Sequence, residues 1–201
     1  MVIDFRTRPP YRGFVTEGNF FPRPMEDQFE RPEEVPGVYL DSVGIESARE
    51  GDFELYMREL SGSGIDMQVV QGRMVRPGMA RVSNDDVCEL ERLFPEKFIS
   101  FPAVDASDPE GAVREIERCY KRYGIRGVAM EPGWCMPPKY VDDRSLDPIY
   151  EKCEELGLIC AFTLSVLAGE DLTYCNPLNV QRAANRFPRV TFTVSHGCWP
   201  F

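Results

Sequence analysis

Two arginines at the end of the first apolar stretch are the strongest candidates for binding chemistry. Arg6 and Arg8 lie two residues apart in the run 2–8, which a pair of prolines stops. Alternate residues of a strand point to the same side, and parallel α/β sheets bind ligands at the C-terminal ends of their strands. Guanidinium groups at such an end would bind a carboxylate or a phosphate. The alternative is that both are surface charges.

The only histidine of the chain is the candidate for acid–base chemistry. His196 follows an apolar strand pattern, at the start of the loop 196–200. The pKa of histidine is close to physiological pH, so its side chain can accept or donate a proton. Glu131 follows another strand pattern and could orient His196 or balance an arginine. The competing interpretations are a structural histidine and a surface carboxylate at a turn.

The ends of the other predicted strands supply the rest of the candidate site. Arg73, Trp134 and Thr163 each lie at or just past the end of an apolar run. Because such ends meet at one edge of a parallel sheet, we expect these side chains to face the same substrate. We therefore predict two catalytic residues, no metal ligand and five substrate-binding residues. The catalytic pair is His196 and Glu131, and the substrate-binding residues are Arg6, Arg8, Arg73, Trp134 and Thr163.

Repeated strand–helix units must position these residues. After the first strand, strand patterns begin near residues 65, 98, 125, 158 and 190, and each step is close to the ~30-residue size of a βαβ element. The helices between them begin at Ser83, Asp108, Asp147 and Asn176. The glycine-rich segment 61–64 precedes a strand instead of following one, which argues against a dinucleotide-binding sheet. We predict an α/β fold, a (β/α)₈ TIM barrel with about six units present, as one domain over residues 1–201; an open six-stranded sheet is the alternative.

The segment 11–51 interrupts this regular pattern. It is rich in proline and aromatic residues, and its prolines preclude a long helix or a central strand. Long insertions in compact domains are functional lids or disordered segments. Since disordered segments contain few aromatic residues, we predict a lid. The strand before it is apolar almost without alternation, which predicts that both of its faces are covered.

Composition excludes several classes of partner. The net charge of −10 and the pI near 4.7 argue against binding to nucleic acid or to an anionic membrane. The seven cysteines include no Cys-x-x-Cys pair, which predicts reduced thiols in a cytoplasmic protein. We expect no signal peptide and no membrane span. A small carboxylate is the expected partner, and assembly into a homo-oligomer stays open.

Several segments resemble one enzyme family. Residues 3–9, Ile-Asp-Phe-Arg-Thr-Arg-Pro, are similar to the Ile-Asp-x-His-x-His-Pro opening of the amidohydrolase-related TIM-barrel family. That family includes aminocarboxymuconate-semialdehyde decarboxylase and related hydrolases. Residues 124–128, 147–158 and 187–200 resemble its later blocks. The similarity covers most of the chain outside the segment 11–51, and the last block is the most specific.

The resemblance implies a divalent metal, by default zinc, whose ligands are mostly missing here. The family holds it with the first-strand His-x-His, histidines that end strands five and six, and an aspartate that ends strand eight. The first positions are Arg6 and Arg8, the strand-five position falls at about Thr163, and only His196 matches. Guanidinium has no lone pair to donate, so we predict a lost or altered metal site and no cofactor. The strand-eight position would lie beyond Phe201, which suggests a truncated chain.

The resemblance also implies an activity. We expect a hydrolase or a decarboxylase that acts on a small carboxylated substrate, with Arg6 and Arg8 as an anion clamp and His196 as acid or base. An arginine clamp can stabilise an oxyanion much as a Lewis acid does. Two alternatives stay open. One is a non-catalytic barrel that binds a carboxylate, and the other is a fragment without activity whose open sheet edges would cause aggregation or oligomerisation.

Overall fold

Strands and helices alternate through the part of the chain that the computed structural model describes, residues 1–16, 45–77, 81–165 and 169–201. The strands are β1 (Ile3–Thr7), β2 (Met67–Gln71), β3 (Phe98–Phe101), β4 (Gly127–Met130), β5 (Ile159–Ser165) and β6 (Phe192–Trp199). The α-helices are α1 (Gly13–Thr16), α3 (Glu46–Glu50), α4 (Phe53–Gly62), α5 (Asn84–Leu93), α6 (Pro109–Tyr123), α7 (Asp147–Leu156) and α8 (Pro177–Arg186). Short 3-10 segments are η2 (Pro132–Trp134), η3 (Arg144–Leu146) and η4 (Leu172–Cys175).

The helix boundaries follow the capping signals of the sequence. The side chains of Ser83, Asp108 and Asn176 accept hydrogen bonds from backbone N–H groups in the first turns of α5, α6 and α8. These bonds satisfy donors that have no partner within the helix. α6 and α7 end at Gly124 and Gly157, whose φ angles of 67° and 66° lie in the left-handed region that glycine adopts at least cost.

The described strands are all parallel and lie in the order of the sequence. One sheet has the order β1-β2-β3 and the other β4-β5-β6. A bridge between Ala103 and Ala129 joins them, with the N–H of Ala129 donating to the carbonyl of Pro102 at 2.9 Å. A doubly wound sheet reverses its strand order at a switch point, and the described strands contain no reversal. The arrangement is that of a TIM barrel, as predicted.

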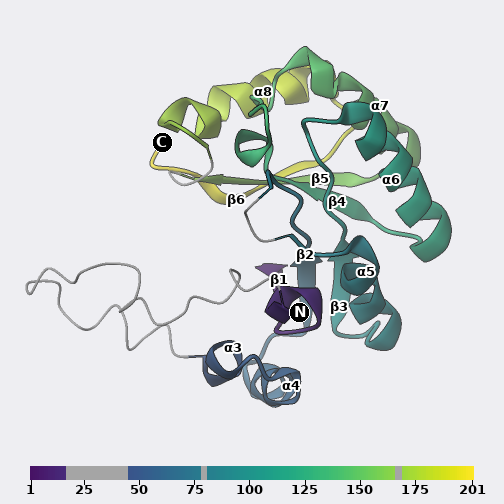
Figure 1. Ribbon diagram of the computed structural model, residues 1–201, viewed down its shortest axis with the longest axis vertical. Coiled ribbons are helices and arrows are strands. Elements are labelled where there is room, and N and C mark those ends of the chain that lie inside the picture. Colours follow the sequence, from purple (N-terminus) through teal and green to yellow (C-terminus); the bar gives the residue numbers. More distant parts are fainter. Residues whose placement is uncertain (17–44, 78–80, 166–168) are drawn as a thin grey trace, which may run out of the picture.

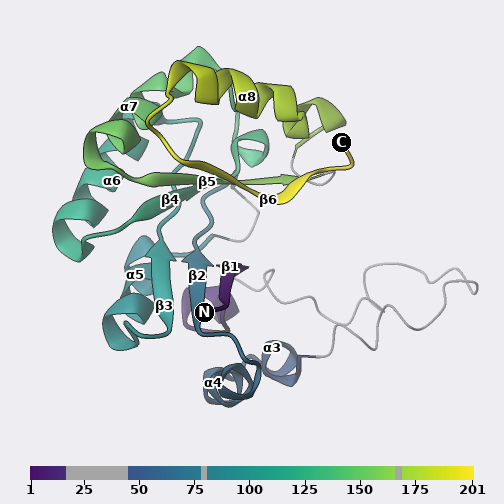
Figure 2. The ribbon, with the colours of Figure 1, turned by 180° about the vertical axis from the view of Figure 1, so that it is seen from behind.

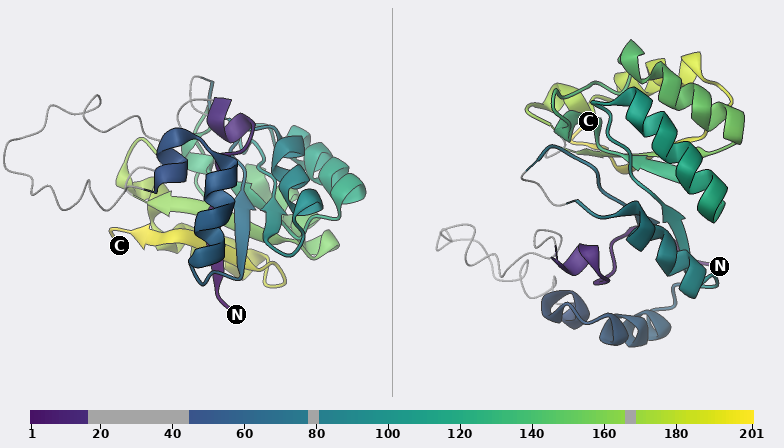
Figure 3. Two further views of the ribbon diagram at one scale, coloured as in Figure 1. Left: turned by 90° about the horizontal axis from the view of Figure 1, so that it is seen from below. Right: turned by 45° about the vertical axis from the view of Figure 1, so that its right-hand side comes forward.

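Helices cover the outer face of this curved sheet. Figures 1 and 2 show α6, α7 and α8 over β4–β6, and α4 and α5 over β1–β3. Figure 3 shows that α3 and α4 lie beside each other at the β1 end, far from α7. Buried apolar side chains such as Leu90 and Phe98 in one half, and Ile149 and Phe162 in the other, fill the space between helices and strands.

The inner face of the sheet carries a thin layer of mostly small residues, formed by Val69, Phe101, Ala103, Ala129 and Ala161. Phe101 occupies the space that Gly127 leaves, since a Cβ added at Gly127 would come within 2.5 Å of the Phe101 ring. The same ring contacts Phe5 edge-on, with 5.7 Å between the ring centroids. The inner layer therefore connects β1, β3 and β4 through direct packing.

The exposure of β1 differs from the prediction that both of its faces are covered. Ile3 and Phe5 keep 46% and 38% of their surface exposed. Among the described strands β1 pairs only with β2, so its other edge is uncovered within the described part. The prediction that both faces of β1 are covered is therefore wrong for the structure described.

Most of the predicted lid, 11–51, lies outside the described residues. Its described ends contain α1 and α3, and Phe14 of α1 is fully buried against the core beneath α5. The lid itself stays a prediction. Elsewhere, all seven cysteines are free and buried. No described helix combines the length and apolarity needed to cross a bilayer.

Candidate active site

A buried carboxylate with two arginine partners forms the centre of the candidate site. Glu131 directly follows β4, and its side chain is only 6% exposed. Its Oε1 accepts a hydrogen bond from Arg8 Nη2 at 2.6 Å, and its Oε2 accepts one from Arg73 Nε at 3.0 Å. A buried charge is tolerated only when it is paired and hydrogen-bonded. With both oxygens engaged, Glu131 holds two arginines at the C-terminal ends of β1 and β2.

Arg6 is the cation of this group that has no carboxylate partner within the described residues. Its Nε is buried and lacks a hydrogen-bond partner there. Burial lowers the pKa of Arg6, Glu131 opposes this, and Arg73 adds repulsion. Burial also lowers the pKa of Arg8, to about 10, against the attraction of Glu131. Two guanidinium groups thus bind Glu131 and a third lies near it, in a chain whose net charge is −10, which makes a local site for an anion.

His196 lies within β6, which continues to Trp199, so the prediction of a loop over 196–200 is wrong; the histidine has an unusual backbone conformation. Its φ is 69°, and Gly197 and Cys198 follow with 58° and 61°. This left-handed region costs a residue with a side chain about 1–2 kcal/mol, and residues held in it cluster at functional sites. Partial burial lowers the pKa of His196, and the positive charges of Arg6 and Arg8 lower it further. The lowered pKa favours the neutral imidazole.

Thr163 of β5 lies beside the part of β6 that carries His196. It pairs with Ser195 in the parallel register of β5 and β6. Two residues earlier Ala161 belongs to the inner layer, so alternation places Thr163 on the inner side as well. Thr163 thus faces the same side of the sheet as the candidate site.

Trp134 lies at the end of η2, three residues after Glu131. Its carbonyl accepts a hydrogen bond from the N–H of Arg76 at 2.9 Å, and the Arg76 guanidinium lies 5.2 Å from the indole ring. This cation–π contact holds Trp134 beside the loop that carries Arg73. Trp134 thus contacts Arg76, and its role as a substrate contact stays a prediction.

Sequence reasoning missed Gln71, the last residue of β2. Its side chain is buried, with 1% exposure. Its Nε2 donates to the carbonyl of Phe5 at 2.8 Å, and its own carbonyl accepts a hydrogen bond from Arg8 Nε at 3.4 Å. The available signal was a glutamine at the end of a strand, where burial of an amide requires a specific partner.

The donor set of this site does not fit a divalent metal. Arg6 and Arg8 contribute guanidinium groups, and both oxygens of Glu131 are engaged by arginines. The part of the chain that the structure describes contains no group of three His, Cys, Asp or Glu side chains able to hold a metal ion. Zinc and manganese need lone pairs, which guanidinium lacks.

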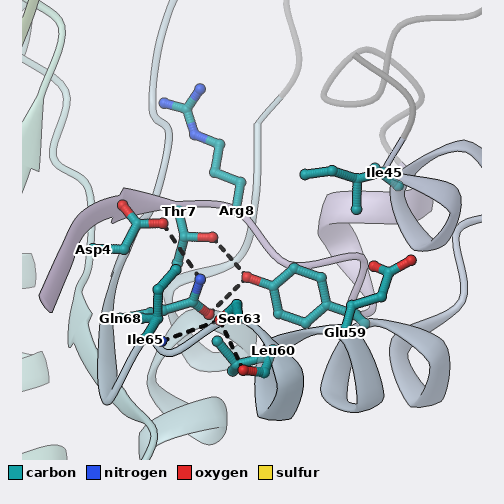
Figure 4. Close-up of a pocket in the computed structure, with 11 residues that line it drawn as sticks. Asp4, Thr7, Arg8, Ile45, Glu59, Leu60, Ser63, Ile65 and Gln68 are labelled. Carbon is teal, nitrogen blue, oxygen red and sulfur yellow. Dashed lines mark hydrogen bonds between the residues drawn. The ribbon is translucent and has the colours of Figure 1, made fainter. Parts of the chain in front are cut away.

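A cavity of about 510 Å³ lies on the other side of β1, between this strand and the helices α3 and α4. Figure 4 shows Asp4, Thr7 and Gln68 on its wall and the guanidinium of Arg8 pointing away from Glu59. The hydroxyl of Tyr56 donates to Gln68 Oε1 at 2.7 Å. Arg8 lines this cavity as well, so it lies between the cavity and the cluster around Glu131.

The fold is a TIM barrel that carries an arginine–carboxylate cluster at the ends of β1, β2 and β4. Residues 39–201 match the family model described as Amidohydrolase, and the chain belongs to this family. It is 28% identical over 116 residues to 2-amino-3-carboxymuconate-6-semialdehyde decarboxylase of Dictyostelium discoideum, covering 53% of this chain and 32% of that protein. It is 39% identical over 71 residues to gamma-resorcylate decarboxylase of a Polaromonas species, covering 35% and 20%. The matches span about a third or less of these curated relatives.

Solved structures agree with the fold. An uncharacterized TIM-barrel protein from Bordetella bronchiseptica superposes with a TM-score of 0.84 and 33% identity, over 99% of this chain and 68% of that one. A 5-carboxyvanillate decarboxylase from Novosphingobium aromaticivorans, solved with bound manganese, gives a TM-score of 0.64 and 17% identity, over 98% and 66%. At that identity the second likeness shows the fold alone.

Proposed function

We propose that this protein is a carboxy-lyase of the amidohydrolase family, which removes CO₂ from a small carboxylated substrate. The observation that carries the proposal is the arrangement of Arg6, whose guanidinium has no described carboxylate partner, beside two arginines that Glu131 holds in place. Such a site favours a substrate carboxylate over solvent water because charge-assisted hydrogen bonds gain strength in a buried site. The decarboxylase names of the curated relatives support the reaction class.

The residues divide the work as follows. Arg6 and Arg8 bind the anion, and Glu131 positions Arg8 and Arg73. In decarboxylation the bond between the substrate carbon and its carboxylate breaks, and CO₂ leaves. The electron pair stays on that carbon, which takes a proton. His196, which lies near enough to Arg6 and Arg8 for their charges to lower its pKa, is the residue that we assign to this proton transfer. Fixed positive charge stabilises the negative charge that develops.

Hydrolysis is the second candidate, and the neutral state of His196 favours it. A neutral imidazole can remove a proton from water, and the arginines can stabilise the oxyanion that forms on an attacked carbonyl. The two reactions share the same binding step and differ in their products. A carboxylated ester or lactone would be the substrate of the hydrolase.

The experiment is a product assay on a panel of small acids. Purified protein is incubated with hydroxylated benzoic acids, including 2,6-dihydroxybenzoate, and CO₂ release is measured; carboxylated lactones in a pH-stat test hydrolysis. The proposal expects CO₂ from at least one acid, and loss of that release in His196→Ala with carboxylate binding retained. Undiminished release in His196→Ala would refute the role of this residue.

Two further outcomes decide between the alternatives. Thermal stabilisation by carboxylates with no product from any member of the panel would support a non-catalytic binding barrel and overturn the proposal. Acid release in the pH-stat without CO₂ would support the hydrolase. A third arm, in which variants at Arg6 and His196 lose the same activity, excludes a contaminating enzyme.

Partner and location are part of the proposal. A small carboxylate is the partner, without nucleic acid, and the location is the cytoplasm. The net charge of −10 and the seven free cysteines support these assignments. Fractionation of the source cells tests the location, and sedimentation analysis of purified protein tests whether it forms a homo-oligomer.

A further inference from the structure

β1 contains one more residue than the matching part of β2. Asp4 pairs with Gln68 and Thr7 pairs with Val70, so β1 advances three residues where β2 advances two. Two residues opposite one form a β-bulge, which interrupts the ladder and redirects the side chains that follow. Bulges of this kind are found next to active sites, where they change the direction of a side chain.

The bulge decides on which side of the sheet Arg8 lies. Asp4 faces the helices, because its Oδ2 accepts a hydrogen bond from Gln68 and it lines the cavity beside α4. In a regular strand Arg8 would share this side with Asp4, since alternate residues point the same way. Instead Thr7 faces the helices, with its Oγ1 2.8 Å from the hydroxyl of Tyr56. Arg8 then turns to the other side and reaches Glu131.

Gln71 holds the chain on both sides of this bulge. Its side-chain Nε2 donates to the carbonyl of Phe5, just before the bulge, and its backbone carbonyl accepts from Arg8 Nε, just after it. Only the NH₂ group of the amide can donate to a carbonyl, so the bond to Phe5 fixes the amide orientation. That orientation leaves the Oε1 buried without a described partner.

An unsatisfied buried oxygen is costly, and each such group needs an explanation. An apolar side chain of similar size would fill the same space without this cost. Gln71 is nonetheless buried at 1% exposure, and the contact that accounts for its amide is the bond from its Nε2 to the Phe5 carbonyl, beside the bulge.

We infer that Gln71 is a positioning residue, which fixes the β1 bulge and thereby turns Arg8 into the anion site. The inference rests on the proposed function, because that function assigns anion binding to the site that Arg8 enters. The positioning itself concerns the fold, and it is tested without substrate.

The test is a thermodynamic cycle on the full chain. Arg8→Met is introduced into the wild type, into Gln71→Met and into Gln68→Met, and urea unfolding midpoints are measured. Gln68 is the matched control, a buried glutamine on the same strand that faces the helices. In the wild type and in Gln68→Met, loss of Arg8 leaves one oxygen of the buried Glu131 without this partner and lowers the midpoint. In Gln71→Met we expect less than half of that shift, because Arg8 no longer reaches Glu131. Equal shifts in all three backgrounds would overturn the inference.

A binding measurement separates positioning from a general effect on stability. Benzoate, which carries one carboxylate, is titrated calorimetrically into the same single variants. We expect Gln71→Met to weaken benzoate binding by about tenfold, the effect of one lost charge-assisted bond, and Gln68→Met to leave it unchanged. Loss of thermal stability in both variants with equal benzoate affinity would mean that Gln71 has only a structural role.

Isosteric variants keep the test decisive if Gln71→Met does not fold. In Gln71→Glu a carboxylate replaces the amide and cannot donate to the Phe5 carbonyl, and Gln68→Glu adds the same charge on the other side of β2. Benzoate affinity lost only in Gln71→Glu supports the inference, and affinity retained in it refutes the inference. Absence of CO₂ release from every acid would overturn the proposed function alone. If the wild type does not bind benzoate, the urea unfolding cycle alone tests whether Gln71 positions Arg8.

Discussion

The guanidinium of Arg8 lies 2.6 Å from the carboxylate of Glu131, although 123 positions separate them in the chain. This pair connects β1 to the end of β4 and is buried. Removal of one partner from a buried pair leaves an uncompensated charge. We therefore expect Glu131→Gln to lower the free energy of unfolding by about 3–5 kcal/mol, measured by urea denaturation at pH 7.

The control for this variant is Glu154→Gln. Glu154 pairs with Arg189 at 2.7 Å, a similar distance, but the Arg189 side chain is 80% exposed. Exposed pairs contribute about 0–1 kcal/mol because water and salt screen them. Losses of similar size in the two variants would show that burial does not strengthen the Arg8–Glu131 pair.

Replacement of Arg6 should separate binding from stability. Arg6 has no carboxylate partner among the described residues, and burial lowers its pKa, so its charge is unfavourable in the folded protein. We expect Arg6→Gln to keep or slightly raise the melting temperature. We also expect it to weaken benzoate binding by about ten- to a hundredfold, the range of a lost hydrogen bond to a charged group. Arg189→Gln, at the far surface, should change neither; unchanged benzoate affinity in Arg6→Gln would remove this residue from the site.

His196→Gly should raise stability and abolish turnover. Glycine relieves the left-handed backbone strain of about 1–2 kcal/mol but adds about 0.5–1 kcal/mol of chain entropy in the unfolded state. The expected net gain is about 0.5–1 kcal/mol. His196→Ala keeps the strain and should lose turnover without the gain. Cys198→Gly, with a φ of 61°, should gain stability and keep turnover. Equal unfolding midpoints of His196→Gly and His196→Ala would contradict the strain.

The lowered pKa of His196 predicts a dependence on pH. The unfolded chain binds the proton at about pH 6.5, and the folded chain binds it only at lower pH. Stability therefore decreases as pH falls below about 6.5, since the unfolded state then binds more protons. His196→Asn should lack this decrease in urea midpoints measured from pH 5 to pH 8. In Arg6→Gln, with one repelling charge removed, the pKa of His196 in the folded protein is lowered less, so the decrease should end at a higher pH and be smaller.

The arginine-rich donor set predicts the metal content. We expect elemental analysis of the purified protein to find zinc and manganese far below one equivalent, and chelation to leave benzoate binding unchanged. Guanidinium groups repel a divalent cation, and Glu131 is already engaged by Arg8 and Arg73. A stoichiometric metal that resists dialysis would show that the site has another ligand set.

Local signals in the sequence predicted much of the fold. The caps at Ser83, Asp108 and Asn176 and the closing glycines marked the helices correctly, because a cap depends on residues only a few positions apart. Strand starts were predicted within about two residues for the same reason. The parallel order followed from the regular spacing of the units.

The candidate site was less predictable, because its contacts depend on register and on distant residues. Alternation indicated only that Arg6 and Arg8 point to the same side, and the side itself depends on the bulge between Asp4 and Thr7. A bulge becomes visible only when the partner strand is known. The double pairing of Glu131 could not be predicted either, because Arg8 and Arg73 come from two other strand ends.

The absence of a side chain at Gly127 affects the packing of β1. The Phe101 ring rests where a methyl group would otherwise stand, and its edge meets Phe5, next to the bulge. A larger residue at 127 would displace the Phe101 ring, which would in turn displace Phe5 on the strand that carries both arginines. Gly127, which lies outside the proposed anion site, thus influences the position of Arg6 and Arg8.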